Sequence, residues 1–194
     1  MNYKIISCYT KNTGYEEEAN QLKKTMAKFG LNTNYILPFE SRGTWEKNCA
    51  YKSKFILKML NNYNKNVVWL DSDARILKKP VLFGNIREDI GLYYFRKRQL
   101  ASGTMYWKNN NSNKKLIIKW INLCEKEPKK WDQLVLQDLM SHQHNSSIFN
   151  LPDEYSTIDK FMKSTNNTVI YHTQASRRLK KTINGKRRIV KKNN

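Results

Sequence analysis

Residues 67–73, VVWLDSD, place four consecutive apolar residues directly before an Asp-Ser-Asp triplet. A short apolar run of this kind is typical of a parallel strand that is buried on both faces of its sheet. Ligands of open α/β sheets bind outside the carboxyl ends of such strands. The stretch therefore predicts a central strand at 67–70, with the carboxylates of Asp71 and Asp73 at a ligand-binding edge.

The residues before this stretch alternate between strand and helix patterns. The apolar segment at 3–9 indicates a buried strand, and a second, short strand is expected at 34–37, closed by Pro38. Apolar residues at helical spacing follow each strand, at 16–29 and at 51–60. This order predicts an α/β fold in which helices flank a mostly parallel central sheet.

The second half of the chain is less regular. Strands are expected at 90–95 and 104–107, on either side of a basic turn, and a last strand is expected at 168–171. Helical stripes of apolar residues occur at 116–124 and 132–140. We find no internal repeat and no linker rich in Pro, Gly or Ser, so the sequence predicts a single domain.

The charge of the chain is strongly positive and uneven. Lys and Arg total 36 against 16 acidic residues, which gives a net charge of +20, and nine of the positive residues follow Tyr171 with no acid among them. We therefore expect a domain at 1–175 and a basic tail at 176–194. Such a tail attracts polyanions, namely nucleic acid, anionic lipid or phosphorylated glycans. A composition rich in Lys and Asn also raises the charge without selection for binding.

The composition bounds the class of protein. The chain has 39% hydrophobic residues and 12% aromatic residues, enough for a folded core. No stretch approaches the roughly 20 apolar residues of a membrane span, and the first residues lack the longer apolar core of a signal peptide. Three cysteines without metal-ligand spacing indicate a reduced compartment. We expect a soluble, cytoplasmic protein, located in the host cytoplasm if it is viral; the sequence does not predict its oligomeric state.

Two carboxylates at i and i+2 after a strand can share a divalent cation, either Mn²⁺ or Mg²⁺. Such a cation stabilises a departing nucleoside diphosphate as a Lewis acid. An Asp-x-Asp triplet by itself is a weak signal, because two carboxylates that cap a turn have the same pattern. The sequence lacks the glycine-rich, G-x-S-x-G and H-E-x-x-H motifs of other enzyme classes. A metal-dependent nuclease or phosphatase remains an alternative, but its pair usually lies nearer the first strand or beside further acids.

Several short segments, taken in order, resemble the GT-A glycosyltransferases, which are nucleotide-diphospho-sugar transferases. The central segment at 67–80, VVWLDSDARILKKP, resembles the strand, Asp-x-Asp and trailing proline of that family. Residues 48–55 resemble its donor-side helix, and residues 101–105 resemble its small-residue segment. Residues 131–133 resemble its acidic helix start, and residues 171–173 resemble its late His. The resemblance implies a single GT-A-like, Rossmann-like domain and a nucleotide-sugar donor, most commonly a UDP-sugar.

The resemblance also implies roles for individual residues. Asp71, Asp73 and His172 are the expected metal ligands, and Asp132 is the expected catalytic residue. The alternatives are a structural role for His172, which lacks the glycine that usually follows it in the family, and a plain N-cap role for Asp132. The residues expected to contact the donor are Tyr9, Thr10, Lys54, Ser72, Ser102, Gly103 and Gln133. Lys54 has the alternative of an ordinary helix face.

The acceptor is inferred from charge. Basic residues that can neutralise phosphates, beside aromatic residues that can stack on a base, favour DNA, and specifically a hydroxylated base as in viral DNA modification. The residues expected to contact it are Arg96, Lys97, Arg98, Arg177, Arg178, Lys180, Lys181, Lys186, Arg187 and Arg188. The alternatives are a protein, lipopolysaccharide or capsid-glycan acceptor, and a non-catalytic basic module that binds nucleic acid.

Overall fold

The computed structural model describes residues 2–142 and 145–183. Its centre is a six-stranded sheet with the order β2-β1-β3-β6-β5-β7. The pairing directions show that β6 runs against the other five strands, so the sheet is mainly parallel, as predicted. These strands are β1 (Tyr3–Thr10), β2 (Ile36–Phe39), β3 (Asn66–Leu70), β5 (Ile90–Phe95), β6 (Gln99–Trp107) and β7 (Ile148–Asn150).

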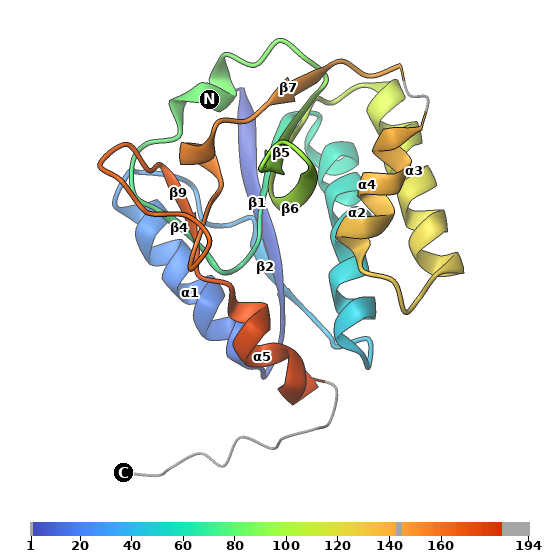
Figure 1. Cartoon of the computed structure of the whole chain (residues 1–194), viewed down its shortest axis with the longest axis horizontal. Helices are drawn as coiled ribbons and strands as arrows, with labels where there is room; N and C mark the ends of the chain where they lie inside the picture. The colour runs from blue at the N-terminus through green and yellow to red at the C-terminus, as the bar shows by residue number, and fades with distance from the viewer. Residues whose placement is uncertain (1, 143–144, 184–194) are drawn as a thin grey trace.

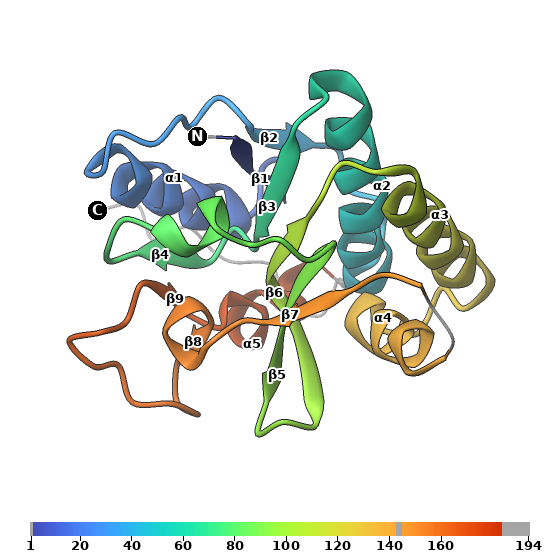
Figure 2. The same cartoon turned by 90° about the horizontal axis from the view of Figure 1, so that it is seen from above.

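Helices cover both faces of this sheet, and a small three-stranded sheet lies beside it (Figure 1). In Figure 2, α1 and the small sheet lie on one side of the central strands, and α2, α3 and α4 lie on the other. The helices are α1 (Gly14–Ala27), α2 (Trp45–Tyr63), α3 (Asn111–Lys126), α4 (Asp132–Ser141) and α5 (Ala175–Ile183). The small sheet has the order β4 (Ala74–Ile76), β9 (Ile170–His172) and β8 (Thr157–Ile158). Two short 3-10 helices occur at Val81–Gly84 and Asp153–Tyr155.

Strand β3 separates two hydrophobic cores. Val68 and Leu70 belong to the core shared with α1, whereas Val67 and Trp69 belong to the core shared with α2, α3 and α4. All four side chains are buried. Because successive side chains of a strand point to opposite faces, a strand covered on both sides must be apolar throughout. This confirms the reading of 67–70 as a central strand.

Two boundaries differ from the prediction, those of β2 and of the C-terminal tail. Strand β2 extends through Pro38, because it lies at the edge of the sheet, where proline is tolerated. Helix α4 begins at Asp132, as predicted, but its N-cap is Trp131, so Asp132 is the first helical residue and not the N-cap. The expected tail begins with α5, which packs against α1: a Cβ added to Gly14 would lie 2.6 Å from a methyl carbon of Leu179.

In the described part of the chain, no helix is long and apolar enough to cross a membrane.

Candidate active site

A cavity of about 410 Å³ lies at the carboxyl ends of β1 and β3. The end of β1, the start of α2, the Asp-Ser-Asp segment, the middle of β6, the start of α4 and the link from β9 to α5 all contribute to its wall. These segments are far apart in the sequence and meet only because the sheet order brings the ends of its inner strands together. The cavity therefore lies where ligands of open α/β sheets bind.

Asp73 and His172 are in contact at the bottom of this cavity. Strand β4 pairs with β9 so that Ala74 lies opposite His172, and this brings Nδ1 of the imidazole to 3.2 Å from Oδ1 of Asp73. The other carboxylate oxygen accepts a hydrogen bond of 2.9 Å from the backbone N–H of Ala175. Burial raises the pKa of Asp73, but the His172 contact, the Ala175 N–H and a nearby arginine outweigh it and hold the pKa below its usual value.

The imidazole of His172 is held from its other side as well. Its Nε2 lies 2.8 Å from the Thr104 hydroxyl on β6. A Cβ added to Gly103 would lie 3.0–3.3 Å from the imidazole ring, closer than ordinary side-chain contacts. The small residue at 103 therefore provides the space in which the His172 ring lies.

Asp71 turns toward α2 rather than toward His172. Its Oδ1 accepts a hydrogen bond of 2.8 Å from Trp69 Nε1 and lies 3.0 Å from Lys52 Nζ. Its backbone N–H donates to the Gly103 carbonyl at 2.8 Å. The Asp71 side chain is 38% exposed, so one part of its carboxylate is open to the cavity.

Lys52 is a buried cation between two carboxylates. Its Nζ lies 3.3 Å from Oδ2 of Asp132 and donates to the carbonyl and hydroxyl oxygens of Ser102. Burial alone would lower the pKa of Lys52, but Asp132 and Asp71 raise it, so the side chain stays charged. The side chains of Lys52 and Asp132 are only 8% and 2% exposed.

Asp132 has an unusual electrostatic environment for a carboxylate. Burial raises its pKa above the usual range, Lys52 opposes this, and the negative charge of Asp71 adds to it. Its neighbour Gln133 accepts a hydrogen bond of 3.2 Å from the Ser102 N–H through Oε1. Perturbed carboxylates in clefts are typical of functional sites.

The structure brings most of the predicted site residues together. Besides the acids and His172, the cavity is lined by Tyr9, Thr10, Ser72, Ser102, Gly103 and Gln133. Lys54 is not among the lining residues: it is 40% exposed on α2 and pairs with Glu125 at 2.6 Å. Residues two apart on a helix point to different faces, and Lys52 is the lysine that faces the cavity.

Lys52 and two tryptophans at the cavity wall were not among the predicted site residues. Lys52 lies in register with the buried residues Phe55 and Ile56 on α2, and that spacing would have identified it. Trp45 and Trp131 come from the starts of α2 and α4 and have ring centroids 5.2 Å apart. No local pattern links these two tryptophans, because they meet only through helix packing.

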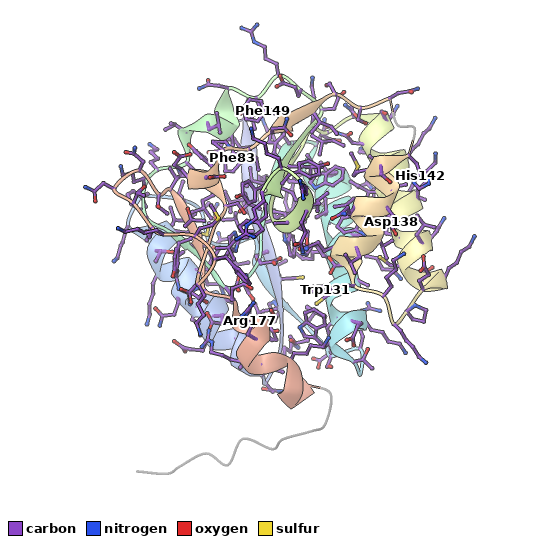
Figure 3. All side chains as sticks on the ribbon, in the orientation of Figure 1. Phe83, Trp131, Asp138, His142, Phe149 and Arg177 are labelled. Atoms are coloured by element: carbon purple, nitrogen blue, oxygen red, sulfur yellow. The ribbon has the colours of Figure 1, made fainter. Side chains whose placement is uncertain are left out.

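The basic residues expected at the acceptor have several different placements. Arg96, Lys97 and Arg98 belong to the tight turn between β5 and β6, where Arg96 and Lys97 have positive φ angles. Arg177, which is labelled on α5 in Figure 3, is one of the residues that line the cavity. Arg178 pairs with Glu18 at 2.7 Å, and Lys180 pairs with Glu46 at 2.8 Å. The side chain of Lys181 and all of Lys186, Arg187 and Arg188 lie outside the described residues.

Asp73 and His172 are the adjacent members of the expected metal-ligand set, whereas Asp71 is drawn toward Lys52. Among residues 2–142 and 145–183, no three His, Cys, Asp or Glu side chains converge as a ready set of ligands. A site with Asp71 as third ligand would need its carboxylate to turn.

A family model covers most of the segments that line the cavity. The model of the nucleotide-diphospho-sugar transferases matches residues 38–183. No match was found among curated protein sequences.

Solved structures of glycosyltransferases share the fold. A glycosyltransferase involved in glycosylation of the major capsid of PBCV-1 aligns with a TM-score of 0.70 and 13% identity, over 94% of this chain and 99% of that one. The glycosyltransferase GlyE of Streptococcus pneumoniae TIGR4 aligns with 0.61 and 14%, over 89% of this chain but only 55% of its own. The galactosyltransferase LgtC, in complex with donor and acceptor sugar analogs, aligns with 0.56 and 10%, over 88% and 87%.

Proposed function

The chain belongs to the nucleotide-diphospho-sugar transferase family, and from this premise we propose that it transfers a sugar from a nucleotide sugar to a hydroxyl acceptor. The observation that supports the proposal best is that Asp71, Asp73, His172, Lys52 and Asp132 all line one cavity at the carboxyl ends of β1 and β3. A UDP-sugar is the first donor to test.

The nucleotide of the donor belongs at the end of β1 in this proposal. Tyr9 and Thr10 line the cavity there, and Tyr15 and Trp45 lie close to them, with a hydrogen bond of 3.0 Å from Trp45 Nε1 to the Tyr15 hydroxyl. Aromatic side chains with a polar group can stack on a flat nucleobase and form hydrogen bonds with its polar edge. The diphosphate would then extend toward Asp73.

We propose that Asp73 and His172, with Asp71, hold a divalent cation, Mn²⁺ or Mg²⁺. Oδ1 of Asp73 and Nδ1 of His172 lie 3.2 Å apart, close enough for both atoms to bind one cation. The cation would supply Lewis-acid stabilisation of the departing diphosphate.

Lys52 and Asp132 would act on the sugar that is transferred. Both side chains are buried, and Lys52 Nζ lies 3.3 Å from a carboxylate oxygen of Asp132. This contact holds the two side chains in place, so neither has to reorganise during the reaction. Asp132 would stabilise the positive charge that develops at the anomeric carbon or accept the proton of the acceptor hydroxyl. Preorganised charges in a site that excludes water contribute more to catalysis than the same charges in water.

We favour a glycan acceptor. The similar structures include an enzyme involved in glycosylating a capsid and one that holds an acceptor sugar analog. A hydroxylated base in DNA is the second candidate, because the net charge of +20 favours a polyanion. In the described part of α5, however, Arg178 and Lys180 already pair with Glu18 and Glu46, which reduces the charge available to a polyanion.

The direct test is turnover of nucleotide sugars. The purified protein with Mn²⁺ should release nucleoside diphosphate from at least one member of a panel of UDP-, GDP- and ADP-sugars. The release should stop with EDTA and return when Mn²⁺ is added. Binding of nucleotide sugars with no release or transfer under any metal would contradict the proposal.

A further inference from the structure

A second cavity of about 390 Å³ adjoins the first. Gln174 and Arg177 line both cavities and so form the boundary between them. Gln174 has a φ of 57°, a left-handed conformation that residues other than glycine rarely adopt. Strained residues of this kind concentrate at functional sites. The wall of the second cavity is charged: Arg75, Lys160, Arg177 and Arg178 are cationic, and Glu18 and Asp159 are acidic.

Two of these cations share one acidic partner. Glu18, whose side chain is 9% exposed, lies 2.5 Å from Arg75 and 2.7 Å from Arg178. In the active-site cavity, Lys52 is likewise paired with Asp71 and Asp132. Each of these cations therefore has a structural explanation within the fold.

Lys160 and Arg177 are different. Within the described residues, neither takes part in an ion pair with an acid. Asp159, beside Lys160 in the sequence, accepts a hydrogen bond of 2.6 Å from the Tyr171 hydroxyl instead. Two cations without an acidic partner in the described part of the chain therefore line the second cavity, and Arg177 also lines the first.

An aromatic surface lies next to Arg177. The guanidinium lies 4.5 Å from the centroid of the Phe161 ring, and Phe161 packs edge to face against Phe95 with centroids 5.8 Å apart. Both phenylalanines line the active-site cavity, and Phe161 is 46% exposed. An exposed aromatic ring in a cavity wall is suited to the apolar C–H face of a sugar ring.

We propose that the acceptor is a sugar that carries an anionic group, either a carboxylate or a phosphate. Its ring packs on Phe161 and Phe95, and its anionic group extends into the second cavity and binds Arg177 and Lys160. Guanidinium groups form paired, charge-assisted hydrogen bonds with both kinds of anion. The inference rests on the proposed sugar transfer and specifies its acceptor. A nucleic-acid strand needs a row of cations along its phosphates, whereas this site offers two cations beside one aromatic surface.

Matched acceptors test the inference. p-Nitrophenyl glycosides of glucose, galactose and mannose would each be compared with the corresponding uronide and 6-phosphate, which differ only at C6. Binding would be measured by saturation-transfer NMR and calorimetry with the nucleotide sugar present. We expect at least one charged member to bind about tenfold more tightly than its neutral counterpart, consistent with one charge-assisted contact. The uronide and 6-phosphate arms distinguish a carboxylate from a phosphate.

Variants localise the preference. Arg177→Gln and Lys160→Gln should each reduce the tenfold preference to about twofold or less. Lys119→Gln removes the same charge from an exposed position on α3 and should retain it. Thermal unfolding of all three variants would verify that they fold.

Equal binding of charged and neutral members in every set, or a preference that survives Arg177→Gln, would overturn the inference. Preferential binding of a single-stranded oligonucleotide over every charged glycoside would also overturn it. Release of nucleoside diphosphate is measured separately, so the proposed function can stand when this inference fails.

Discussion

The imidazole of His172 lies 3.2 Å from the carboxylate of Asp73, although 99 residues separate them in the chain. The contact depends on the small sheet, in which β9 pairs with β4 directly after the Asp-Ser-Asp segment. Asp73 is also bound by the first backbone N–H of α5. One carboxylate thus connects the central sheet, the small sheet and the C-terminal helix at the bottom of the cavity.

The first prediction concerns this carboxylate. Asp73→Asn removes a charge without changing the shape of the side chain. We expect kcat for sugar transfer to fall by about a thousandfold, because metal stabilisation of the leaving group contributes several kcal/mol. Steady-state kinetics with varied Mn²⁺ would measure the loss. EDTA should reduce the wild-type activity to a similar level.

The matched control is Asp138→Asn. Asp138 lies on α4, with its side chain 57% exposed and 2.7 Å from Lys130 (Figure 3). This variant loses the same charge and should keep its activity within about twofold, because exposed ion pairs contribute little. Full activity of Asp73→Asn, or of the wild type in EDTA, would show that the cation assignment is wrong.

The second prediction concerns Lys52 and Asp132. Lys52→Met leaves Asp132 buried without its cation, which should lower the free energy of unfolding by about 3 kcal/mol. Asp132→Asn should abolish most transfer while donor binding is retained, because its contribution arises in the transition state. Urea unfolding and calorimetric titration with the nucleotide sugar would measure the two effects.

The double variant tests whether the two residues act as a pair. Neutralising Asp132 removes the buried charge that Lys52→Met leaves uncompensated. The stability lost by the double variant should therefore be smaller than the sum of the two single losses by about 1 kcal/mol or more. Lys54→Met, two residues away on α2, breaks an exposed pair with Glu125 and should cost less than about 0.5 kcal/mol. Strict additivity for Lys52 and Asp132 would indicate that Asp71 alone neutralises the lysine.

The sequence predicted the parts of the site that lie next to strong local patterns. The apolar run before Asp71 predicted β3, and the rule for strand ends predicted that Asp71 and Asp73 would lie at a cavity, as they do. Lys52 was missed although its spacing to Phe55 follows the helical repeat, because a lysine on a helix is usually exposed.

Contacts made by packing could not be predicted. Helix α5 was read as a basic tail, since its charge obscures the apolar spacing of Ala175 and Leu179. Its position depends on distant partners, such as the pairing of Arg178 with Glu18, 160 residues away. A single sequence carries no local signal for an ion pair at that separation.

The third prediction concerns pH and Asp89, which lies outside the cavity. Its Oδ2 accepts a hydrogen bond of 3.0 Å from the Ser147 N–H, and its Oδ1 accepts one of 2.7 Å from Asn110. The Ser147 N–H is the main cause that lowers the pKa of Asp89. A carboxylate whose pKa is lower in the folded state stabilises the protein above the unfolded pKa of about 4, and this stability is lost as the pH falls through the folded pKa.

Asp89→Asn should therefore be about 1 kcal/mol less stable than the wild type at pH 7 and nearly equal to it at about pH 2. Urea unfolding at several pH values would measure the difference. Glu88→Gln, at the half-buried neighbouring acid, is the control that removes the same charge at the same place in the chain. If the stability difference between Asp89→Asn and the wild type stays constant across this pH range, then the hydrogen-bond geometry of Asp89, and not its charge, stabilises the fold.

The last prediction concerns the end of the chain and separates the two acceptor candidates. Truncation after Ile183 removes five positive residues: Lys186, Arg187, Arg188, Lys191 and Lys192. If these residues contact DNA phosphates, the log–log slope of affinity against salt should become shallower by about 0.9 for each contact removed. Fluorescence anisotropy with a labelled duplex at several salt concentrations would measure the slope. Release of nucleoside diphosphate should stay within about twofold, because Asp73, His172 and Asp132 are retained.

Mass spectrometry of the acceptor completes this test. A glycan acceptor predicts that the truncated protein still modifies charged glycosides, even where its affinity for DNA has fallen. A DNA acceptor predicts instead that truncation raises the KM for DNA containing hydroxylated bases and also weakens the salt dependence of DNA binding. Arg177→Gln with Arg178→Gln separates the charges of α5 from those beyond Ile183, since Arg177 lines the cavity and Arg178 pairs with Glu18. Truncation leaves the residues of the two cavities in place, so it should not affect a glycan acceptor that binds there. If the full chain transfers sugar to a hydroxylated base and the truncated protein does not, the glycan acceptor is rejected.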